Sequence, residues 1–304
     1  MAWIALFGLA ACNSGEQSSS GKLRIVATTG MVADLARNIG GDSIEVEALM
    51  GPGVDPHLYK ATQGDLTQLR EADVILYNGL HLEGKMGEIF EKLGRVQTVV
   101  AVAESVPESE LISDPTFQDA KDPHIWFNTR LWAQTIDAVQ VTLSEATPEH
   151  AAFYERNAEK YKKQLLDLHK WVQAKVLSIP KEKRVLITAH DAFSYFGKAY
   201  GIEVRGLQGL STQSEFGLKD RVNLVNFIVE REIKAIFVET SVSKKNIQAI
   251  VESCRDKGHE VVIGGSLYSD AMGAEGTPEG TYKGMVEANV NTIVSSLTPT
   301  PKQK

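Results

Sequence analysis

Short apolar runs alternate along this chain with longer stretches in which apolar residues recur every three or four positions. The short runs predict buried strands, and the 3-to-4 spacing predicts amphipathic helices. The predicted strands cover residues 23–28, 44–50, 73–77, 98–102, 185–188, 203–207, 235–238 and 260–263, and the predicted helices between them include residues 31–39, 64–71, 85–93, 129–144 and 244–257. Strand and helix alternate in both halves, which indicates an α/β fold with mainly parallel sheets flanked by helices.

The longest periodic segment, residues 148–178, lies between the two halves. Pro148 suits a first helical turn, and Pro180 closes the far end. One apolar stripe follows the segment, formed by Ala151, Tyr154, Ala158, Tyr161, Leu165, Leu168 and Val172. A helix of this length extends for roughly 46 Å, so we predict one long rigid linker helix along two lobes. A coiled-coil partner strand would use the same stripe, and this alternative stays open.

The predicted elements divide the chain into four parts. Residues 1–21 form a signal and tether, 22–147 an N-terminal lobe, 148–178 the linker helix and 179–304 a C-terminal lobe. The chain has 304 residues, of which 43% are hydrophobic and 23% charged, enough for two cores. Its formal net charge is -7. Because no Lys/Arg-rich stripe accompanies that charge, we expect no nucleic-acid partner.

The N-terminus carries an apolar run, residues 2–11, followed by Cys12 and a small, polar stretch. Leu9-Ala10-Ala11-Cys12 resembles a bacterial lipobox with Cys12 as the lipidated residue. The run is shorter than the roughly 20 apolar residues that span a bilayer, so we predict export and lipid anchoring rather than a membrane span. The alternative to a lipoprotein signal is that these residues are simply a frayed apolar terminus. No Lys or Arg precedes the run, so we expect a truncated or misassigned start.

Histidines in short loops indicate a metal site. His57 and His124 each end an Asp-Pro-His phrase, in which proline stiffens the backbone, and His190 follows the strand at 185–188. Asp270 comes after the last predicted strand. Open parallel sheets bind ligands beyond the carboxyl ends of their strands, and two-lobed proteins bind them between the lobes. With Cys12 lipidated, Cys254 is a lone, buried small hydrophobe, so histidine and carboxylate must supply the ligands.

Four motifs occur in order along the chain: Gly51-Pro52-Gly53-Val54-Asp55-Pro56-His57, Asp122-Pro123-His124-Ile125-Trp126, Thr188-Ala189-His190-Asp191-Ala192-Phe193 and Ser269-Asp270-Ala271. With these motifs the chain resembles the substrate-binding lipoproteins of zinc/manganese ABC importers, the TroA-like cluster A-I family. The likeness extends from Leu23 to about Leu297. It implies two α/β lobes joined by a long helix, and one divalent metal held by His57, His124, His190 and Asp270.

The resemblance also implies partners and a location. An ABC permease and its ATPase would receive the ion from a monomeric, non-enzymatic carrier, exported and lipid-anchored at the periplasmic or extracellular face of a bacterial membrane. Three imidazoles and one carboxylate suit Zn²⁺, and four protein ligands leave no position for an activated water, which favours transport over hydrolysis. Zinc-specialised relatives carry a histidine-rich loop before the second ligand, and residues 104–122 contain no histidine, which argues against a dedicated zinc scavenger. Manganese-type relatives carry glutamate in place of His190, so the histidine here points towards zinc. We therefore expect Zn²⁺ or Mn²⁺ as cargo, one ion per chain.

Two other function classes remain. A surface adhesin lipoprotein would use the metal structurally, and a zinc hydrolase would need a His-Glu-x-x-His or Gly-x-Ser-x-Gly motif, neither of which occurs.

Several other residues have expected secondary roles. Asp55, Asp122 and Asp191 are candidates to accept a ring N–H from a ligand. His81 is expected at the rim, while His150 and His169 are expected to be solvated. We expect metal release to depend on loops such as residues 266–276, whose glycines permit rearrangement.

Overall fold

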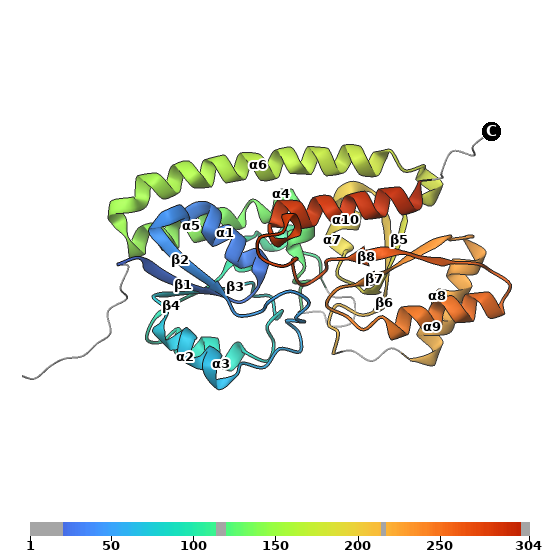
Figure 1. Ribbon diagram of the computed structural model, residues 1–304, viewed down its shortest axis with the longest axis horizontal. Coiled ribbons are helices and arrows are strands. Elements are labelled where there is room, and N and C mark those ends of the chain that lie inside the picture. The colour runs from blue at the N-terminus through green and yellow to red at the C-terminus, as the bar shows by residue number, and fades with distance from the viewer. Residues whose placement is uncertain (1–20, 114–119, 214–216, 299–304) are drawn as a thin grey trace, which may run out of the picture.

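The computed structural model describes residues 21–113, 120–213 and 217–298. Two α/β lobes lie side by side beneath one long helix, α6 (Ala151–Leu177), which runs across both of them (Figure 1). The predicted lipidation site Cys12 and the tether as far as residue 20 lie outside the described residues. Among the helices of the described residues, none is long and apolar enough to cross a membrane.

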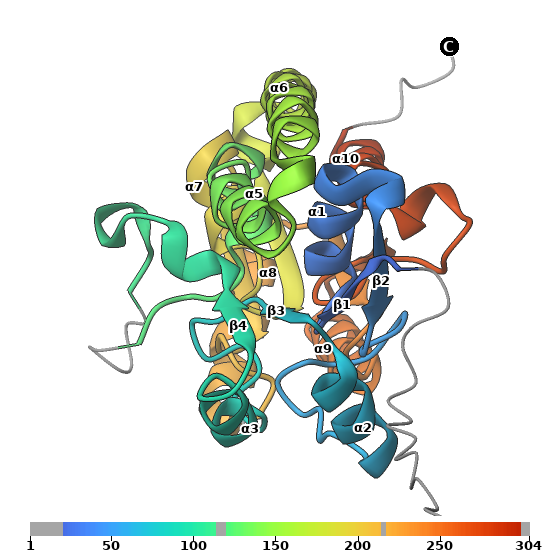
Figure 2. The same cartoon turned by 90° about the vertical axis from the view of Figure 1, so that its left-hand side faces the viewer.

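The N-terminal lobe is built on a parallel sheet with the strand order β2-β1-β3-β4. These strands are β1 (Leu23–Ala27), β2 (Ile44–Ala48), β3 (Val74–Tyr77) and β4 (Thr98–Ala101). Figure 2 shows α1 (Gly30–Gly40) and α5 (Thr135–Ala146) on one side of the sheet, and α2 (Gln63–Glu71) and α3 (Gly87–Leu93) on the other. The strands are parallel, so their carboxyl ends share one edge, the edge at which ligand-bearing loops are expected.

The C-terminal lobe contains two parallel strand pairs that lie side by side. β5 (Val185–His190) pairs with β6 (Glu203–Gln208), β7 (Ala235–Glu239) pairs with β8 (Val262–Leu267), and β5 lies beside β7. The helices of this lobe are α7 (Ser194–Tyr200), α8 (Leu218–Glu230), α9 (Lys245–Asp256) and α10 (Tyr282–Leu297). The α/β fold expected from the sequence, with mainly parallel sheets flanked by helices, is confirmed.

The predicted bounds of β8 were wrong. We expected a strand at residues 260–263, but it runs from Val262 to Leu267 and includes Gly264 and Gly265. A Cβ on Gly264 would lie 2.9 Å from the Cβ of Ser296, and one on Gly265 only 2.4 Å from the methyl group of Thr292. The two glycines therefore let α10 pack closely on the strand, rather than ending it as their turn propensity suggests.

Helix α10 itself was not predicted, although its pattern is present in the sequence. Its buried apolar residues recur at helical spacing, as Tyr282, Met285, Val286, Val290, Ile293 and Leu297. The Thr281 side chain caps its start by accepting from the backbone N–H of Gly284. The predicted helix at 129–144 is divided into α4 (Thr129–Trp132) and α5, and at this break the Thr135 hydroxyl donates to the carbonyl of Trp132 at 2.8 Å.

The predicted stripe on the long helix is buried almost as expected. Residues 148–150 form a separate 3₁₀ turn, which leaves a helix of 27 residues, or about 40 Å. Its buried residues are Tyr154, Ala158, Tyr161, Leu165, Leu168, Val172 and Val176. The helix packs against α1 and α5 of the first lobe and against α7 and α10 of the second. The stripe is thus covered within one chain, so the coiled-coil alternative is wrong.

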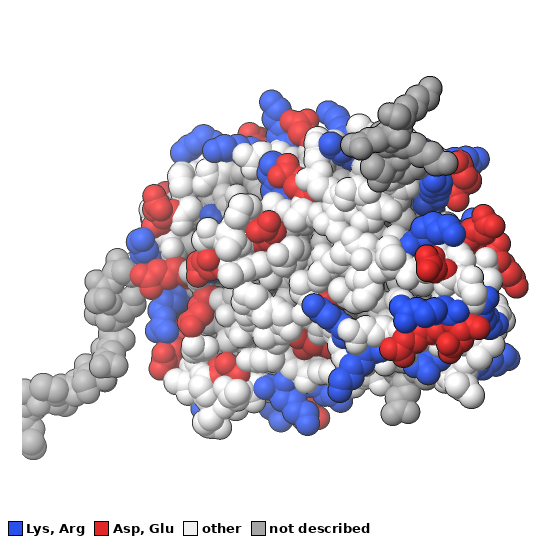
Figure 3. Space-filling view, turned by 45° about the vertical axis from the view of Figure 1, so that its right-hand side comes forward, with Lys and Arg blue, Asp and Glu red and all other residues white. Residues whose placement is uncertain are grey.

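Charged residues are spread over the surface. On the face shown in Figure 3, acidic and basic side chains are intermingled, with no continuous basic stripe.

Candidate metal centre

Four side chains from separate loops converge between the lobes. His57 lies in the loop after β2 and His124 in the loop before α4, whereas His190 ends β5 and Asp270 follows β8. Each is at most 2% exposed. One donor atom from each lies within 4.8 Å of those from the other three. The structure therefore brings together all four residues singled out from the sequence, two from each lobe.

The spacing of the donor atoms suits a small cation. Nε2 of His57 lies 3.3 Å from Nε2 of His124. Nε2 of His190 lies 3.2 Å from Oδ2 of Asp270, and Nε2 of His124 lies 3.5 Å from Oδ1. Four tetrahedral ligands about 2.0–2.1 Å from Zn²⁺ would lie roughly 3.3 Å apart. The contact between Nε2 of His57 and Oδ2 of Asp270 is longer, at 4.0 Å.

Several of these atoms are buried without a hydrogen-bond partner. Among the described residues, Nε2 of His190 and both carboxylate oxygens of Asp270 have none, even though the two side chains approach closely. Unpartnered buried polar atoms are rare in folded proteins because each one forgoes its hydration. A cation bound at the centre would remove that cost for all three atoms.

Two carboxylates behind the centre fix the imidazole rings. Nδ1 of His124 donates to Oδ1 of Asp122 at 2.8 Å, and Nδ1 of His190 donates to Oε2 of Glu239 at 2.5 Å. Oε1 of Glu239 also accepts the backbone N–H of His190 at 2.9 Å. With Nδ1 protonated, the lone pair of each Nε2 points towards the centre, where it can bind a metal.

Asp122 was predicted for this role, but Glu239 was missed. It lies 49 residues beyond His190 in the sequence. The available signal was a carboxylate at the carboxyl end of an otherwise apolar strand, beside the strand that carries His190.

The other two predicted carboxylates do not contact a ring nitrogen in the described part of the chain. Oδ1 of Asp55 accepts the backbone N–H of His57 at 2.9 Å, and Oδ1 of Asp191 accepts the hydroxyl of Ser194 at 2.8 Å. Each carboxylate therefore stabilises a loop conformation instead of orienting an imidazole.

The histidines of the centre differ in their protonation. Burial lowers the pKa of His57 to about 3, although the nearby carboxylate of Asp270 acts to raise it. Burial would also lower the pKa of His190, but the carboxylates of Asp270 and Glu239 outweigh it and raise that pKa well above its usual value. Burial would raise the pKa of Asp270, yet the surrounding imidazoles, His190 first, hold it below its usual range. In the metal-free protein these neighbours favour the protonated imidazole of His190 and the ionised carboxylate of Asp270.

The remaining residues of interest lie away from the centre. His81 and His150 are exposed. His169 is half-buried, with Nδ1 3.1 Å from the hydroxyl of Tyr200, so it is less solvated than we expected. Cys254 is fully buried, in agreement with its prediction as a small hydrophobe.

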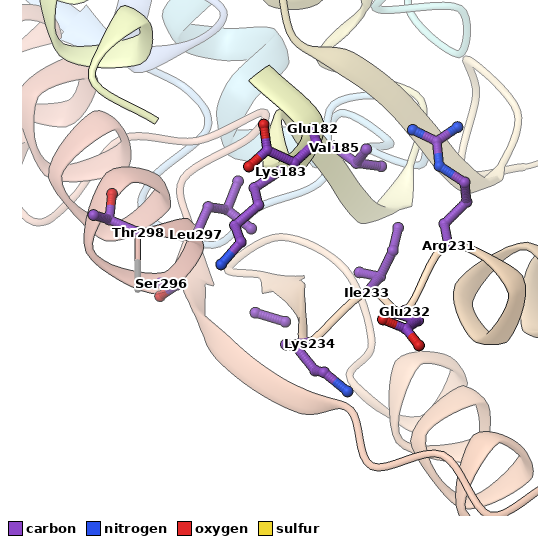
Figure 4. A pocket seen from close by; sticks show the side chains of 11 residues that line it. Glu182, Lys183, Val185, Arg231, Glu232, Ile233, Lys234, Ser296, Leu297 and Thr298 are labelled. Atoms are coloured by element: carbon purple, nitrogen blue, oxygen red, sulfur yellow. The ribbon is translucent and has the colours of Figure 1, made fainter. Parts of the chain in front are cut away.

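A pocket at the far end of the C-terminal lobe is separate from the centre (Figure 4). Its lining includes Val185 and Ala235, the first residues of β5 and β7. His190 and Glu239 end the same two strands, about 16 Å away along β5 and about 13 Å away along β7 at 3.3 Å per residue. The lining contains no histidine.

Comparisons of this chain with a family profile, with curated relatives and with solved structures point to the same family. A profile described as zinc-uptake complex component A, periplasmic, matches residues 25–296. The chain is 51% identical to the manganese-binding lipoprotein MntA of Bacillus subtilis (strain 168) over 299 residues, which covers 97% of this chain and 96% of that protein. It is 48% identical to the zinc-binding protein TroA of Treponema pallidum (strain Nichols) over 288 residues, covering 94% of this chain and 92% of that protein.

A solved structure also matches. The periplasmic zinc binding protein TroA from Treponema pallidum superposes on this chain with a TM-score of 0.89 at 48% identity, covering 92% of this chain and 100% of the other.

Proposed function

The chain belongs to the family of periplasmic zinc-uptake complex component A proteins, and on that premise we propose that it is the substrate-binding protein of an ABC metal importer. It captures one divalent ion, Zn²⁺ or Mn²⁺, between its lobes and delivers that ion to a membrane permease driven by an ATPase. One observation carries the proposal: three imidazole nitrogens and one carboxylate, all buried and contributed by both lobes, meet within 4.8 Å of one another. We propose His57, His124, His190 and Asp270 as the ligands.

This ligand arrangement supports carriage rather than catalysis. A zinc hydrolase keeps a coordination position open for a water molecule, whereas four protein donors complete a tetrahedral shell. An adhesin with a structural metal would need the ion in order to fold. Each lobe here has apolar residues buried around its own sheet, so we expect the lobes to fold without the ion. The family is one of solute-binding transport proteins, which agrees with the carrier function.

The chemistry of the four ligands bears on which ion is carried. The two curated relatives are named for different metals, manganese and zinc. Imidazole-rich sites bind Zn²⁺ more tightly than Mn²⁺ by the general affinity order of divalent metals. We propose that this centre accepts both ions and holds Zn²⁺ more tightly, so that metal availability decides the cargo.

The location and organisation of the protein complete the proposal. We propose export, lipid anchoring through Cys12, and action as a monomer whose lobes are residues 22–147 and 179–304, joined by the linker helix at 148–178. Relatives named as lipoproteins support the anchor. The stripe of α6 is covered by helices of the same chain, which supports the monomer.

Metal removal tests this function. After chelator treatment, the protein from Lys22 to Lys304 is expected to stay folded and to take up one Zn²⁺ per chain in a calorimetric titration, followed by a weaker titration with Mn²⁺. Adding an ion at about 100 times its Kd should raise the free energy of unfolding by about 2.7 kcal/mol, because the ion binds only the folded state. Loss of circular dichroism on chelation would favour a structural metal, and no uptake of either ion would contradict the carrier.

The pH dependence of zinc affinity follows from the protonation of the two histidine ligands with shifted pKa values. His57 is already neutral at any pH well above 3, whereas His190 must lose its proton before Nε2 can bind. Below the raised pKa of His190, affinity is expected to fall about tenfold per pH unit, and above that pKa it should level off. Because the pKa is raised, the fall starts above the usual histidine range. Calorimetry in buffers of different ionisation enthalpy should show about one proton released per Zn²⁺; release of none would contradict this assignment.

A further inference from the structure

The three histidines of the centre are not held equally. The rings of His124 and His190 are each tied to a buried carboxylate through Nδ1. Within the described part of the chain, Nδ1 of His57 donates to no such group, and this residue is held through its backbone instead. Its N–H donates to Oδ1 of Asp55 at 2.9 Å, in its own loop.

Two side chains of the opposite lobe hold the His57 loop in place. The hydroxyl of Thr212 donates to Oδ2 of Asp55 at 2.6 Å, and Nε2 of Gln213 donates to the backbone carbonyl of His57 at 2.7 Å. Thr212 is half-buried and Gln213 is exposed. We call this pair of cross-lobe hydrogen bonds, from Thr212 and Gln213 to residues 55–57, the clasp.

The cross-lobe contacts around His124 are of a different kind. Trp126 donates from Nε1 to the carbonyl of Ser269 at 3.0 Å, and the hydroxyl of Tyr195 donates to the carbonyl of Asp122 at 3.0 Å. Both aromatic side chains are almost completely buried. The two clasp hydrogen bonds are only partly buried, and breaking fully buried hydrogen bonds costs more than breaking bonds that water can reach and replace. The lobes therefore separate more easily at the clasp than beside His124.

The loop that carries Asp270 is also firmly held. We expected release to depend on residues 266–276, but the side chain of Asn289 bonds both the N–H and the carbonyl of Tyr268, at 2.9 and 2.7 Å. Further along the same loop, the N–H of Gly273 donates to the carbonyl of Glu279 at 2.8 Å. These contacts leave the His57 loop as the least restrained of the four ligand-bearing segments.

We infer that His57 is the ligand that leaves first when the ion is released, and that Thr212 and Gln213 are positioning residues that hold it in place. The inference rests on the proposed function and adds a route for release to it. His57 also has the longest contact to Asp270, at 4.0 Å, which agrees with a ligand that closes the centre last and opens it first. The rate of metal release is then set by two hydrogen bonds at the lobe boundary.

The test measures zinc dissociation from the variant Thr212→Val/Gln213→Leu. Both substitutions keep the approximate shape of the side chain and remove its hydrogen bond, so we expect the dissociation rate to rise about tenfold. The rate is followed by mixing the zinc-loaded protein with a fluorescent chelator in stopped flow. The single variant Thr212→Ser, which keeps both the hydroxyl and Gln213, should release Zn²⁺ at a rate close to that of the wild type.

Matched controls separate the clasp from a general loss of hydrogen bonds. Nε2 of Gln97 donates to the carbonyl of Leu69 at 2.8 Å, and the hydroxyl of Thr67 donates to the carbonyl of Gln63 at 3.1 Å, both within one lobe. Thr67→Val/Gln97→Leu should release Zn²⁺ at the wild-type rate. If this control accelerates release as much as the clasp variant does, or if the clasp variant releases at the wild-type rate, the inference is overturned.

A second measurement tests the role of His57 itself. In a His57→Ala background, where three ligands remain, the clasp substitutions should no longer change the rate, because they act through a ligand that is absent. Acceleration that persists in that background would mean that the clasp holds the lobes rather than His57, and would contradict the inference. A wild-type protein that binds no Zn²⁺ at all would instead contradict the proposed function, before any rate is measured.

Discussion

The Asp270→Ala variant is expected to lose tight zinc binding while it remains folded. Asp270 is the one anionic member of the proposed ligand set, and it lies within 4.0 Å of an Nε2 atom of each of the three histidines. Without it, the ion would face three neutral imidazoles and an open position. Loss of a residue that hydrogen-bonds a metal ligand lowers metal affinity roughly 10–100-fold. We therefore expect loss of the ligand Asp270 itself to lower the affinity by more than about 100-fold.

The measurement is a calorimetric zinc titration of chelator-treated protein, with circular dichroism as the check on folding. Asp256→Ala is a suitable control, since Asp256 is an exposed aspartate at the end of α9 in the same lobe. The control should bind Zn²⁺ like the wild type. Zinc affinity that is indifferent to Asp270 would remove this residue from the ligand set and leave the centre without a charged donor.

Glu239→Gln is expected to weaken zinc binding by roughly 10–100-fold, the range typical of partners that orient a metal-binding histidine. The single amide carbonyl of glutamine can accept only one of the two His190 N–H groups that Glu239 accepts, so the variant removes the charge and one hydrogen bond with little change in shape. The imidazole of His190 becomes a weaker metal ligand because the carboxylate that accepts its Nδ1–H no longer stabilises positive charge on the ring. Glu252→Gln, at an exposed position on α9, is the matched control.

The same variant changes the pH profile in a defined direction. The carboxylate of Glu239 helps to raise the pKa of His190, so its neutralisation should lower that pKa. The pH below which zinc affinity falls should then move downward, even though affinity at high pH is weaker. An unchanged affinity together with an unchanged profile would show that Glu239 does not act through His190.

Much of the fold follows from local sequence patterns. The apolar runs marked most strands to within a few residues, since strands buried between helix layers contain few polar residues. The spacing of Tyr154, Ala158, Tyr161, Leu165, Leu168 and Val172 gave the buried face of α6 directly, because one face of a long helix repeats every three or four positions. The ligand candidates were recognisable because all four of them follow or end predicted strands or lie in stiff Asp-Pro-His loops.

The rest depended on contacts between distant segments. Gly264 and Gly265 have the composition of a turn, and only the approach of α10 explains why they lie within a strand. Glu239 reaches His190 because β5 and β7 lie side by side, an arrangement that the order of strands along the chain does not specify. The bond between Thr212 and Asp55 joins residues 157 positions apart and in different lobes. No local pattern carries such information.

The most direct test of the account is the position of the bound ion. Crystals of the zinc-loaded protein should show a single anomalous difference peak at the zinc absorption edge, within bonding distance of His57, His124, His190 and Asp270, with zinc–nitrogen distances of about 2.0–2.1 Å. A peak bound by other side chains, or one coordinated mainly by water with these four residues turned away, would contradict the account.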